Sequence, residues 1–544
     1  MEFNLAQLHE AVADVIPEQD CIVYRDRRLS WSQVTERTRR LANYLLARGL
    51  TIRRDRSELQ GWESGQAHIA LYMYNCNEYL EGMLGAFKAR AVPFNVNFRY
   101  VEEELVYLLH DSSAEAIVYH GTFAKTLAGI LPQLPKLEVL IQVEDGSGEP
   151  LLPGAVEYEA ALASVSADKP AVEWSPDDLY ILYTGGTTGM PKGVLWRQGD
   201  VFVAALGGRR RDGTPMVDLD DVLAAAARPG MKTLPAPPFM HGAAHWAAFT
   251  NFHSGNTIVV QRDGSRFDAN DVLETIEREQ VTALLIVGDA FARPLLDQLD
   301  AGTYDLSALK VLITGGAALS ASLKVQFLEK LPELTIVDAI GSSETGGQGQ
   351  NVSTRASGAT TGSFMPAPDT CVLSEDLSGV LEPGDPAIGW FAKSGQVPLG
   401  YLGDREKTER TFPTIGGTRY SVPGDRSLHR ADGIIEVYGR DSQTINSGGE
   451  KIFAEEVEHA LKQHPKIWDA VVVGRASERW GQEVVALVKL RDSETASREE
   501  LIEACTKHIA RYKLPKDVLF LDEIVRSPSG KADYRWAKAQ VEGD

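Results

Sequence analysis

Short apolar runs that alternate with amphipathic segments constrain the fold of this chain most strongly. A typical amphipathic segment starts at Ser30, which forms an S-x-x-Q capping box with Gln33 and precedes apolar residues at helical spacing. Gly49 stands where a helix commonly ends. Buried strands are predicted at 68–75, 91–95, 116–120, 139–143, 257–261, 283–287, 311–315 and 335–340. This alternation predicts large α/β layers.

The length of the chain and a change of pattern predict two domains. A chain of 544 residues exceeds the size of about 300 residues at which single cores usually divide. After about residue 370 the pattern changes to short strands and turns, and from Gly439 it resembles a separate α+β unit. We therefore expect an α/β protein with a large multi-layer domain at 1–439 and a small α+β domain at 440–544. In the small domain, helices are predicted at 452–461 and 498–512.

The net charge, the cysteines and the N-terminal sequence indicate which kinds of partner and which cellular compartment to expect. The net charge of −21 argues against non-specific binding to nucleic acid. The cysteines form no CxxC pair and are expected to be free thiols in a reducing compartment; they are Cys21, Cys76, Cys371 and Cys505. The N-terminus lacks the basic and apolar regions of a secretory signal, and no apolar run reaches the ~18 residues of a membrane span. A cytoplasmic location without a transmembrane segment is the expectation.

The stretch YTGGTTGMPKGV (183–194) has the composition of a polyphosphate cradle. Glycines without a Cβ let backbone N–H groups approach an anion, while threonine hydroxyls and a lysine add donors and charge. The G-x-x-x-x-G-K-[ST] spacing of the P-loop is absent, and a Gly/Thr-rich surface turn is the alternative. The residues concerned are Thr184, Gly185, Gly186, Thr187, Thr188, Gly189 and Lys192.

The complete string resembles the phosphate-loop motif of the adenylate-forming superfamily, which comprises acyl-CoA synthetases, adenylation domains and luciferases. That motif usually has Ser where this chain has Gly185. Further matches follow in family order: PPFMHGAAHW (237–246), TGGAALS (314–320), AIGSSETGG (339–347), YSVPGD (420–425), GRDSQTINSGGEKI (439–452) and SPSGK (527–531). Segments 95–105 and 287–297 are similar to those of a subgroup of acyl-CoA synthetases that includes ligases for steroid side-chain carboxylates and other bulky lipid acids.

The resemblance implies roles for residues of the large domain. His241 would lie beside the acyl pocket, and Glu344 would bind Mg2+ together with Thr187, a carboxylate and a hydroxyl being hard oxygen ligands. Ser343 replaces the usual threonine and keeps its hydroxyl. The adenine would approach Gly315, Gly316, Ala317 and Ile340, the last of which replaces a tyrosine.

The resemblance also implies roles around the domain boundary. Asp425 would accept hydrogen bonds from ribose, and Arg440 would lie near ribose and phosphate. Ser442 occupies the hinge position, where Asp or Lys is more usual. Lys531 would be the catalytic lysine, and the small domain would rotate between two half-reactions. Gly448 and Gly449 would then flank the pantetheine channel.

These roles imply an acyl-CoA synthetase with ATP, Mg2+ and CoA. The acyl-side segments at 241–246, 287–292 and 340–344 are rich in Gly, Ala and Ser, which predicts a medium-to-long fatty acid or a steroid side-chain acid, unless these residues only pack against helices. The expected partners are the carboxylic acid, ATP and CoA, and not nucleic acid. A monomer and a homodimer both stay open, as do an acyl-AMP ligase loading a separate carrier protein, a luciferase-like oxygenase and a non-catalytic binding protein.

Overall fold

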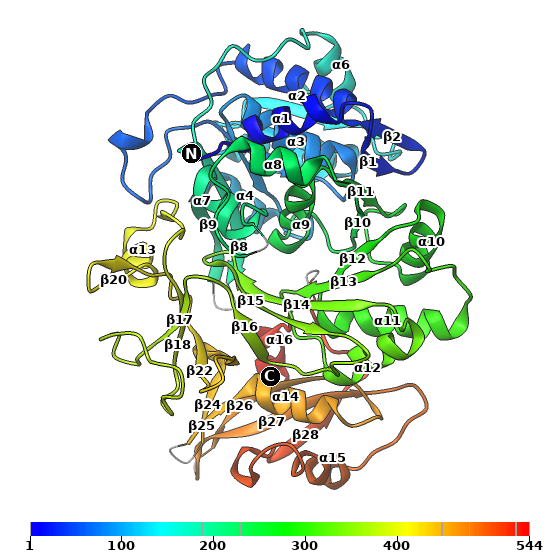
Figure 1. Cartoon of the computed structure of the whole chain (residues 1–544), viewed down its shortest axis with the longest axis vertical. Helices are drawn as coiled ribbons and strands as arrows, with labels where there is room; N and C mark the ends of the chain where they lie inside the picture. The colour runs from blue at the N-terminus through cyan, green and yellow to red at the C-terminus, as the bar shows by residue number, and fades with distance from the viewer. Residues whose placement is uncertain are drawn as a thin grey trace.

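The computed structural model describes residues 2–186, 189–210, 212–228, 230–447, 450–477, 479–527 and 530–542, without side chains for 185–189. Figure 1 shows a large unit above a smaller one, which begins near β24. The mixed α/β architecture confirms the predicted fold class. No helix in the described ranges is long and apolar enough to cross a membrane. The cysteines are free, as predicted.

A parallel sheet forms the N-terminal part of the large unit. Its strand order is β4-β3-β5-β6-β7, with β3 (His68–Tyr72), β4 (Val92–Asn95), β5 (Ala116–His120), β6 (Val139–Val143) and β7 (Val156–Glu157). The helices of this region are α1 (Leu5–Val15), α2 (Trp31–Leu46), α3 (Asn77–Lys88), α4 (Glu102–Asp111), α5 (Ala124–Ile130) and α6 (Tyr158–Ala163). Ser30 and Gln33 form the predicted capping box of α2.

A second, longer sheet runs through the large unit in the order β17-β18-β22-β23-β16-β15-β14-β13-β12-β10-β11-β1-β2. The strands from β11 to β14 are parallel, and β14 then pairs antiparallel with β15. These strands are β1 (Asp20–Tyr24), β2 (Arg27–Ser30), β10 (Lys232–Pro235), β11 (Thr257–Val260), β12 (Ala283–Ile286), β13 (Val311–Gly315), β14 (Thr335–Ser342), β15 (Gly346–Ser353), β16 (Ser363–Pro366), β17 (Thr370–Leu373), β18 (Gly389–Lys393), β22 (Asp425–His429) and β23 (Ile435–Arg440).

The remaining described elements of the large unit are seven α-helices, a hairpin and a small third sheet. The helices are α7 (Gln198–Ala205), α8 (Leu219–Ala226), α9 (Gly242–Phe252), α10 (Ala269–Glu279), α11 (Gly288–Ala301), α12 (Ala321–Lys330) and α13 (Arg405–Thr411). One hairpin joins β20 (Thr414–Ile415) to β21 (Thr418–Arg419). Another small sheet has the order β19-β9-β8, with β8 (Leu179–Gly186), β9 (Gly189–Arg197) and β19 (Gly400–Tyr401).

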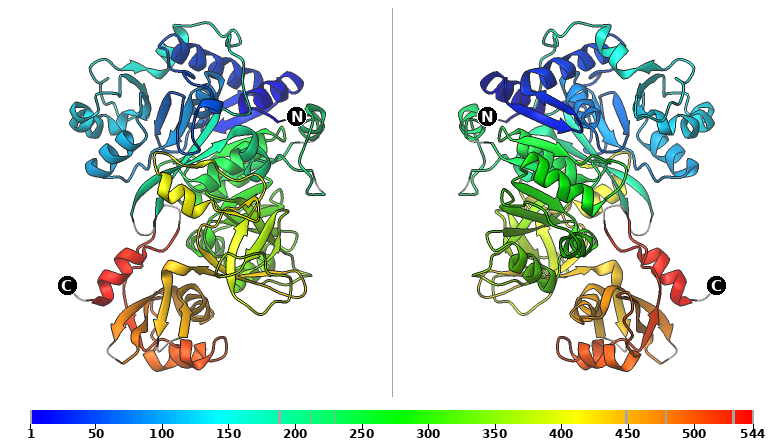
Figure 2. Two further views of the ribbon diagram at one scale, coloured as in Figure 1. Left: turned by 90° about the vertical axis from the view of Figure 1, so that its left-hand side faces the viewer. Right: turned by 90° about the vertical axis from the view of Figure 1, so that its right-hand side faces the viewer.

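The small unit has its own sheet and core. Strands follow the order β25-β24-β27-β26, and β28 pairs with β27. Their bounds are β24 (Thr444–Ser447), β25 (Glu450–Phe453), β26 (Ile467–Ser477), β27 (Gly481–Leu490) and β28 (Asp517–Phe520), with helices α14 (Ala454–Lys462), α15 (Arg498–Cys505) and α16 (Tyr534–Glu542). Buried residues of these elements form one apolar cluster. Figure 2 shows the unit as a lobe at the end of the molecule.

Several predicted boundaries were wrong. The helix expected at 452–461 begins at Ala454, because Ile452 and Phe453 pair with β24 in a strand. The helix expected at 498–512 ends at Cys505, and the chain then turns so that Ile509 and Leu514 enter the core of the small unit. The phosphate segment was expected to be a loop, but its described part is the end of a hairpin, since β8 runs to Gly186 and β9 begins at Gly189.

Candidate active site

The carboxyl ends of four neighbouring parallel strands lead into the motifs found in the sequence. β10 precedes the His241 segment, β12 precedes 287–292, β13 precedes the glycine-rich 314–320 segment, and β14 ends one residue before Ser343. Ligands of open α/β sheets bind outside the carboxyl ends of the strands. The topology therefore brings segments that are far apart in the sequence to one edge of one sheet (Figure 1).

Contacts from three other segments fix the turn that carries Glu344. Tyr401 donates a hydrogen bond from its hydroxyl to Oε1 of Glu344 at 2.8 Å. Ser421 donates from Oγ to the carbonyl of Glu344 at 2.6 Å, and Trp196 donates from Nε1 to the carbonyl of Ser343 at 2.9 Å. Tyr401 is buried in β19 and was not predicted as a site residue, because it belongs to no motif. The carboxylate of Glu344 is thus held in one orientation.

The phosphate hairpin presents Lys192 beside two carboxylates. Thr184 lies opposite Lys192 in the register of β8 and β9. The Nζ of Lys192 lies 3.6 Å from Oδ1 of Asp111 and 3.8 Å from Oδ2 of Asp404. Gly185, Gly186 and Gly189 lie where the two strands end, whereas Thr187 and Thr188 fall outside the described residues.

Asn95 connects this hairpin to the His241 segment. Its Nδ2 donates to the carbonyls of Tyr183 at 2.8 Å and Met240 at 2.7 Å, and its Oδ1 accepts from the N–H of Tyr183 at 2.8 Å. The side chain is buried at the end of β4. No role was predicted for Asn95, although its position as a polar residue at the end of a buried strand could have indicated one.

The glycine-rich turn after β13 has little room for side chains. A Cβ added to Gly315 would lie 2.9 Å from the carbonyl oxygen of Ala339, and Gly316 has a φ of +84°, which favours glycine. Ala317 follows in the same turn. Ile340, on the adjacent β14, packs against a small apolar cluster of Val372, Phe391 and Ile435. A flat base could therefore approach the backbone here beside an aliphatic surface.

Asp425 and Arg440 face each other across β22 and β23. The Nε of Arg440 lies 3.0 Å from Oδ1 of Asp425, and its Nη1 donates to the carbonyl of Pro423 at 2.8 Å. Burial raises the pKa of Asp425, Arg440 opposes that shift, and the nearby carboxylate of Glu344 adds to it. The pair combines an acceptor for hydroxyl groups with a cation at the end of the large unit.

Lys531 of the small unit lies among these groups of the large unit. Its side chain is exposed, although surrounding protein partly desolvates the ammonium group. This desolvation and the charge of Arg440 lower the pKa of Lys531, while Glu344, Asp425 and Glu455 act in the opposite direction. The preceding Gly530 packs against the start of α11, where an added Cβ would lie 3.3 Å from the Cβ of Ala290.

His241 is a neutral group in this arrangement. It occupies the N-cap position of α9, and its Nε2 is buried without a hydrogen-bond partner in the described part of the chain. Burial lowers the pKa of His241 to about 3, and the charges of Lys531, His245 and Arg99 act in the same direction. In the neutral imidazole, Nε2 either donates or accepts a hydrogen bond, according to the tautomer.

The predicted hinge lies in a short 3-10 turn, η4 (Asp441–Gln443). Ser442 is exposed at its centre. Gly448 and Gly449, predicted to flank a pantetheine channel, fall outside the described residues.

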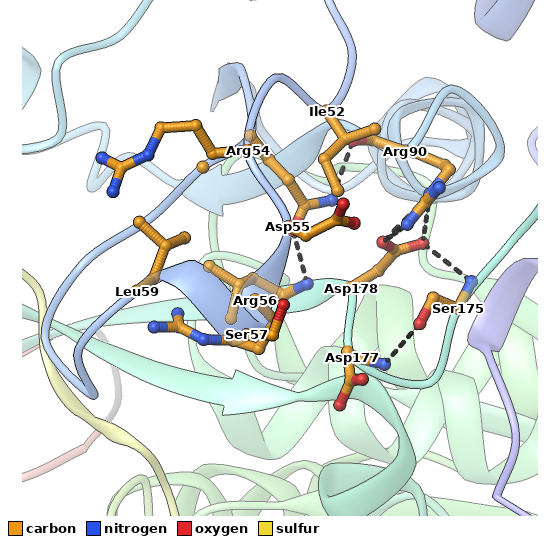
Figure 3. A pocket seen from close by; sticks show the side chains of 13 residues that line it. Ile52, Arg54, Asp55, Arg56, Ser57, Leu59, Arg90, Ser175, Asp177 and Asp178 are labelled. Carbon is orange, nitrogen blue, oxygen red and sulfur yellow. Dashed lines mark hydrogen bonds and ion pairs between the residues drawn. The ribbon is translucent and has the colours of Figure 1, made fainter.

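A separate polar cavity of about 110 Å³ lies in the N-terminal part of the large unit. Figure 3 shows Arg90 directed towards Asp178, and their atoms Nη2 and Oδ1 are 2.8 Å apart. Arg54, Asp55 and Arg56 from the 51–66 segment line its other side. None of the predicted site residues lines this cavity, so it is not part of the arrangement around Lys531.

Models of two protein families match the chain. The model described as AMP-binding enzyme matches residues 9–402, and the model described as AMP-binding enzyme C-terminal domain matches residues 456–531. The chain is 54% identical over 541 residues to the medium-chain acyl-CoA ligase Mig of Mycobacterium avium, covering 99% of this chain and 98% of that protein.

A second relative and a solved structure extend the comparison. The 3-oxocholest-4-en-26-oate–CoA ligase of Rhodococcus rhodochrous is 40% identical over 550 residues, which cover 99% of this chain and 96% of that protein. The crystal structure of an anthranilate CoA ligase in complex with anthranoyl-AMP superposes with a TM-score of 0.83 at 21% identity, covering 99% of this chain and 98% of that one. At this identity the superposition supports the fold alone.

Proposed function

This chain belongs to the AMP-binding enzyme family as an AMP-forming acyl-CoA synthetase, and we propose that it activates a bulky apolar carboxylic acid. A free carboxylate is a poor electrophile, and its transfer to AMP supplies a good leaving group. In the first half-reaction the carboxylate attacks the α-phosphate of ATP, which releases pyrophosphate and leaves an acyl-AMP. In the second, the thiol of CoA attacks the acyl carbon and displaces AMP.

The assignment of residues is supported by the position of Gly530, which directly precedes Lys531 and packs against the start of α11 in the large unit. The charges of Glu344, Asp425 and Arg440 also affect the pKa of Lys531. Two anions must approach each other in the first half-reaction, so fixed positive charge is needed where negative charge develops. Lys531 and Arg440 supply that charge, and Asp425 would accept hydrogen bonds from ribose. We propose that the hydroxyl of Ser343 and the neutral His241 would lie near the carboxylate of the substrate and assist the same step.

The residues present fit a magnesium ion bound together with nucleotide phosphates. Mg2+ in such sites takes one or two protein carboxylates and completes its shell with phosphate oxygens and water. Tyr401 orients Glu344 through Oε1, and Oε2 bonds no residue in the described ranges, which leaves an oxygen for the ion. Glu344 would hold Mg2+, which supplies positive charge to the phosphates when bound. We keep Thr187, outside those ranges, as the proposed second ligand.

We propose that the small domain, from residue 440 onward, turns about Ser442 between the half-reactions. In the described conformation Gly530 packs against the start of α11, and the charges of Glu344 and Asp425 act on Lys531, which supports a role for this arrangement in the first half-reaction. Rotation would withdraw Lys531 and bring Gly448 and Gly449 to the site of thioester formation. The units 1–439 and 440–544 are thus proposed as functional domains, with the phosphate hairpin and the turn at Gly315, Gly316 and Ala317 holding ATP on the first.

The nature of the acid rests mainly on the relatives. Several glycines near the acyl side are closely packed, because an added Cβ would lie 2.8 Å from Cδ2 of Leu182 at Gly242 and 2.1 Å from the carbonyl oxygen of Gly346 at Gly341. These glycines serve packing and do not by themselves open a cavity. The relatives are named as ligases of a medium-chain acid and of a steroid side-chain acid. We therefore propose a medium-to-long fatty acid or a steroid side-chain acid.

A substrate panel tests this proposal. Acetate, octanoate, palmitate and a C24 or C27 steroid acid are each incubated with ATP, Mg2+ and CoA, and kcat/KM is obtained from pyrophosphate release and acyl-CoA mass. Burial of apolar area contributes about 25 cal/mol per Å², so kcat/KM should rise by several tenfold steps from acetate to octanoate. A preference for acetate or for an amino acid would refute the proposed acid without affecting the adenylate chemistry.

The same assay separates the alternative acceptors. Acyl-AMP that accumulates with CoA present would favour a ligase that loads a separate carrier protein, and light emission with a luciferin would favour a luciferase-like oxygenase. We propose a cytoplasmic enzyme, because ATP and CoA are available there. Light scattering decides between a monomer and a homodimer.

A further inference from the structure

One face of α11 contacts the small unit at three successive positions. Ala290, Arg293 and Asp297 are three, then four residues apart, and this spacing places them on the same side of a helix. Ala290 lies beneath Gly530, Arg293 faces Trp468, and the Oδ1 of Asp297 lies 3.9 Å from Nη1 of Arg491. In Figure 1, α11 and α12 lie between the strands of the large unit and the small unit.

Trp468 lies close to two arginines, Arg293 of the large unit and Arg491 of the small unit. The guanidinium carbon of Arg293 lies 5.8 Å from the centre of the Trp468 rings, and that of Arg491 lies 5.5 Å from it. Both distances are within the range in which an aromatic face attracts a cation. Arg293 is only 5% exposed, and its Nε and Nη2 have no hydrogen-bond partner in the described part of the chain. The Nη2 of Arg293 lies 3.8 Å from Oδ2 of Asp289, so the indole of Trp468 adds to the compensation that this carboxylate provides for the buried charge.

A short series of contacts connects Trp468 to Lys531. The neighbouring Asp469 binds Arg526 through two contacts, Nε to Oδ2 at 2.6 Å and Nη2 to Oδ1 at 2.7 Å. The Nη1 of Arg526 donates to the carbonyl of Gly530 at 2.9 Å, directly before Lys531. Bidentate pairs of this kind fix orientation as well as distance. If Trp468 shifts relative to α11, these contacts should therefore change the position of Lys531 as well.

We propose that Arg293 and Trp468 are positioning residues for the first half-reaction: they dock the small domain on α11 and so hold Lys531 against the nucleotide residues. The segment 287–297 would then have a second role besides bordering the acyl side, because its residues Ala290, Arg293 and Asp297 contact the small domain. The inference rests on the proposed role of Lys531. Thioester formation, which needs the other orientation of the small domain, should not depend on this contact.

The experiment measures the two half-reactions separately in the full-length enzyme. Acyl-AMP formation is followed by pyrophosphate release without CoA, and thioester formation starts from chemically prepared octanoyl-AMP and CoA. We expect Trp468→Ala and Arg293→Ala each to slow acyl-AMP formation about tenfold, the effect of losing one desolvated cation–π contact, and to leave thioester formation within twofold. Because each substitution removes the same contact, the double variant should lose little more than either single variant.

Controls separate this effect from misfolding. Lys169→Ala removes a similar contact, a lysine 4.9 Å from the ring centre of Trp174 and far along the chain from α11, and should change neither half-reaction. Trp468→Phe keeps an aromatic face and should recover part of the loss. The ratio of the two rates within one preparation does not depend on the folded fraction.

The rates of the two half-reactions decide whether Arg293 and Trp468 have the proposed docking role. Equal losses in both half-reactions, no loss of acyl-AMP formation, or fully additive losses in the double variant would overturn the docking role. Lys531→Ala is the reference for the proposed function, and it should lower acyl-AMP formation by about two to three orders of magnitude. If Lys531→Ala spares that step, the proposed role of the lysine fails; if only the Trp468 and Arg293 variants spare it, the docking inference alone fails.

Discussion

Replacing Asn95 by alanine should destabilise the large domain measurably. The side chain makes three buried hydrogen bonds, two to Tyr183 and one to Met240. A buried hydrogen bond contributes about 1 kcal/mol, so Asn95→Ala should lower the free energy of unfolding by about 3 kcal/mol. Because the bonds connect β8 to the segment that ends in His241, we also expect slower acyl-AMP formation.

Two comparison variants test the reasoning. In Asn95→Asp the carboxylate can still accept from the N–H of Tyr183, but it cannot donate and would face two carbonyl oxygens, so it should be at least as damaging as alanine. Asn97→Ala is the matched control, because Asn97 lies two residues away and accepts one bond, from the N–H of Arg99. Asn97→Ala should lower the free energy of unfolding by less than about 1 kcal/mol.

Urea unfolding followed by tryptophan fluorescence gives the midpoints of the four proteins. From the most to the least stable, the expected order is wild type, Asn97→Ala, Asn95→Ala and Asn95→Asp. If Asn95→Ala fell within about 0.5 kcal/mol of Asn97→Ala, or if Asn95→Asp were milder than Asn95→Ala, the bonding scheme around Asn95 would be refuted.

Tyr401→Phe removes the hydrogen bond to Glu344, and a bond to a charged group contributes roughly 1.5–3 kcal/mol, so the variant should slow acyl-AMP formation about tenfold and should also lower the melting temperature. An unchanged rate measured by pyrophosphate release would contradict the orienting role. Ser442→Pro fixes φ at the centre of an exposed 3-10 turn and should retain acyl-AMP formation but impair transfer to CoA, whereas wild-type rates in both steps would place the hinge elsewhere. Burial lowers the native pKa of His120, His241, His245 and His253 to about 4, 3, 4 and 4, so the unfolded chain binds protons below pH 6.5 that the native chain does not. Stability should therefore fall as pH drops from about 6.5 towards 4, by about 1.4 kcal/mol per pH unit for each histidine, and a melting temperature that is flat between pH 6.5 and 5 would refute this.

The order of elements and most strand positions could be predicted because hydrophobic runs and caps are local signals. VLIQV and VLITG correspond to β6 and β13 without a shift, and α2 begins at the predicted capping box. The start of α14 could not be predicted, because Ile452 and Phe453 have the composition of a helix face and become a strand only through pairing with β24. Propensity is overridden there by tertiary contacts.

The proposed site residues come from contiguous motifs in the sequence, whereas the residues that hold them in place could not be found in this way. Tyr401 bonds Glu344 from the two-residue strand β19, and no local sequence pattern predicts that this strand pairs with β9. Arg293 is an ordinary helical arginine until Trp468, far along the chain, is placed against it. Residues of this kind act through contacts between distant segments, and one sequence carries no direct record of such contacts.

The pairing of β1 with β11 sets the order in which the chain can fold during synthesis. Ile22 lies beside Ile258 in a parallel arrangement, so the partner of β1 is made about 230 residues later. At roughly 5–20 residues per second, the edge of β1 that pairs with β11 waits for its partner for roughly 10–50 s. The contacts of the small domain lie within the last part of the chain and need no such delay. Slow completion of the large domain should therefore limit the yield of soluble protein, and a chaperone that shields the first 250 residues should raise it.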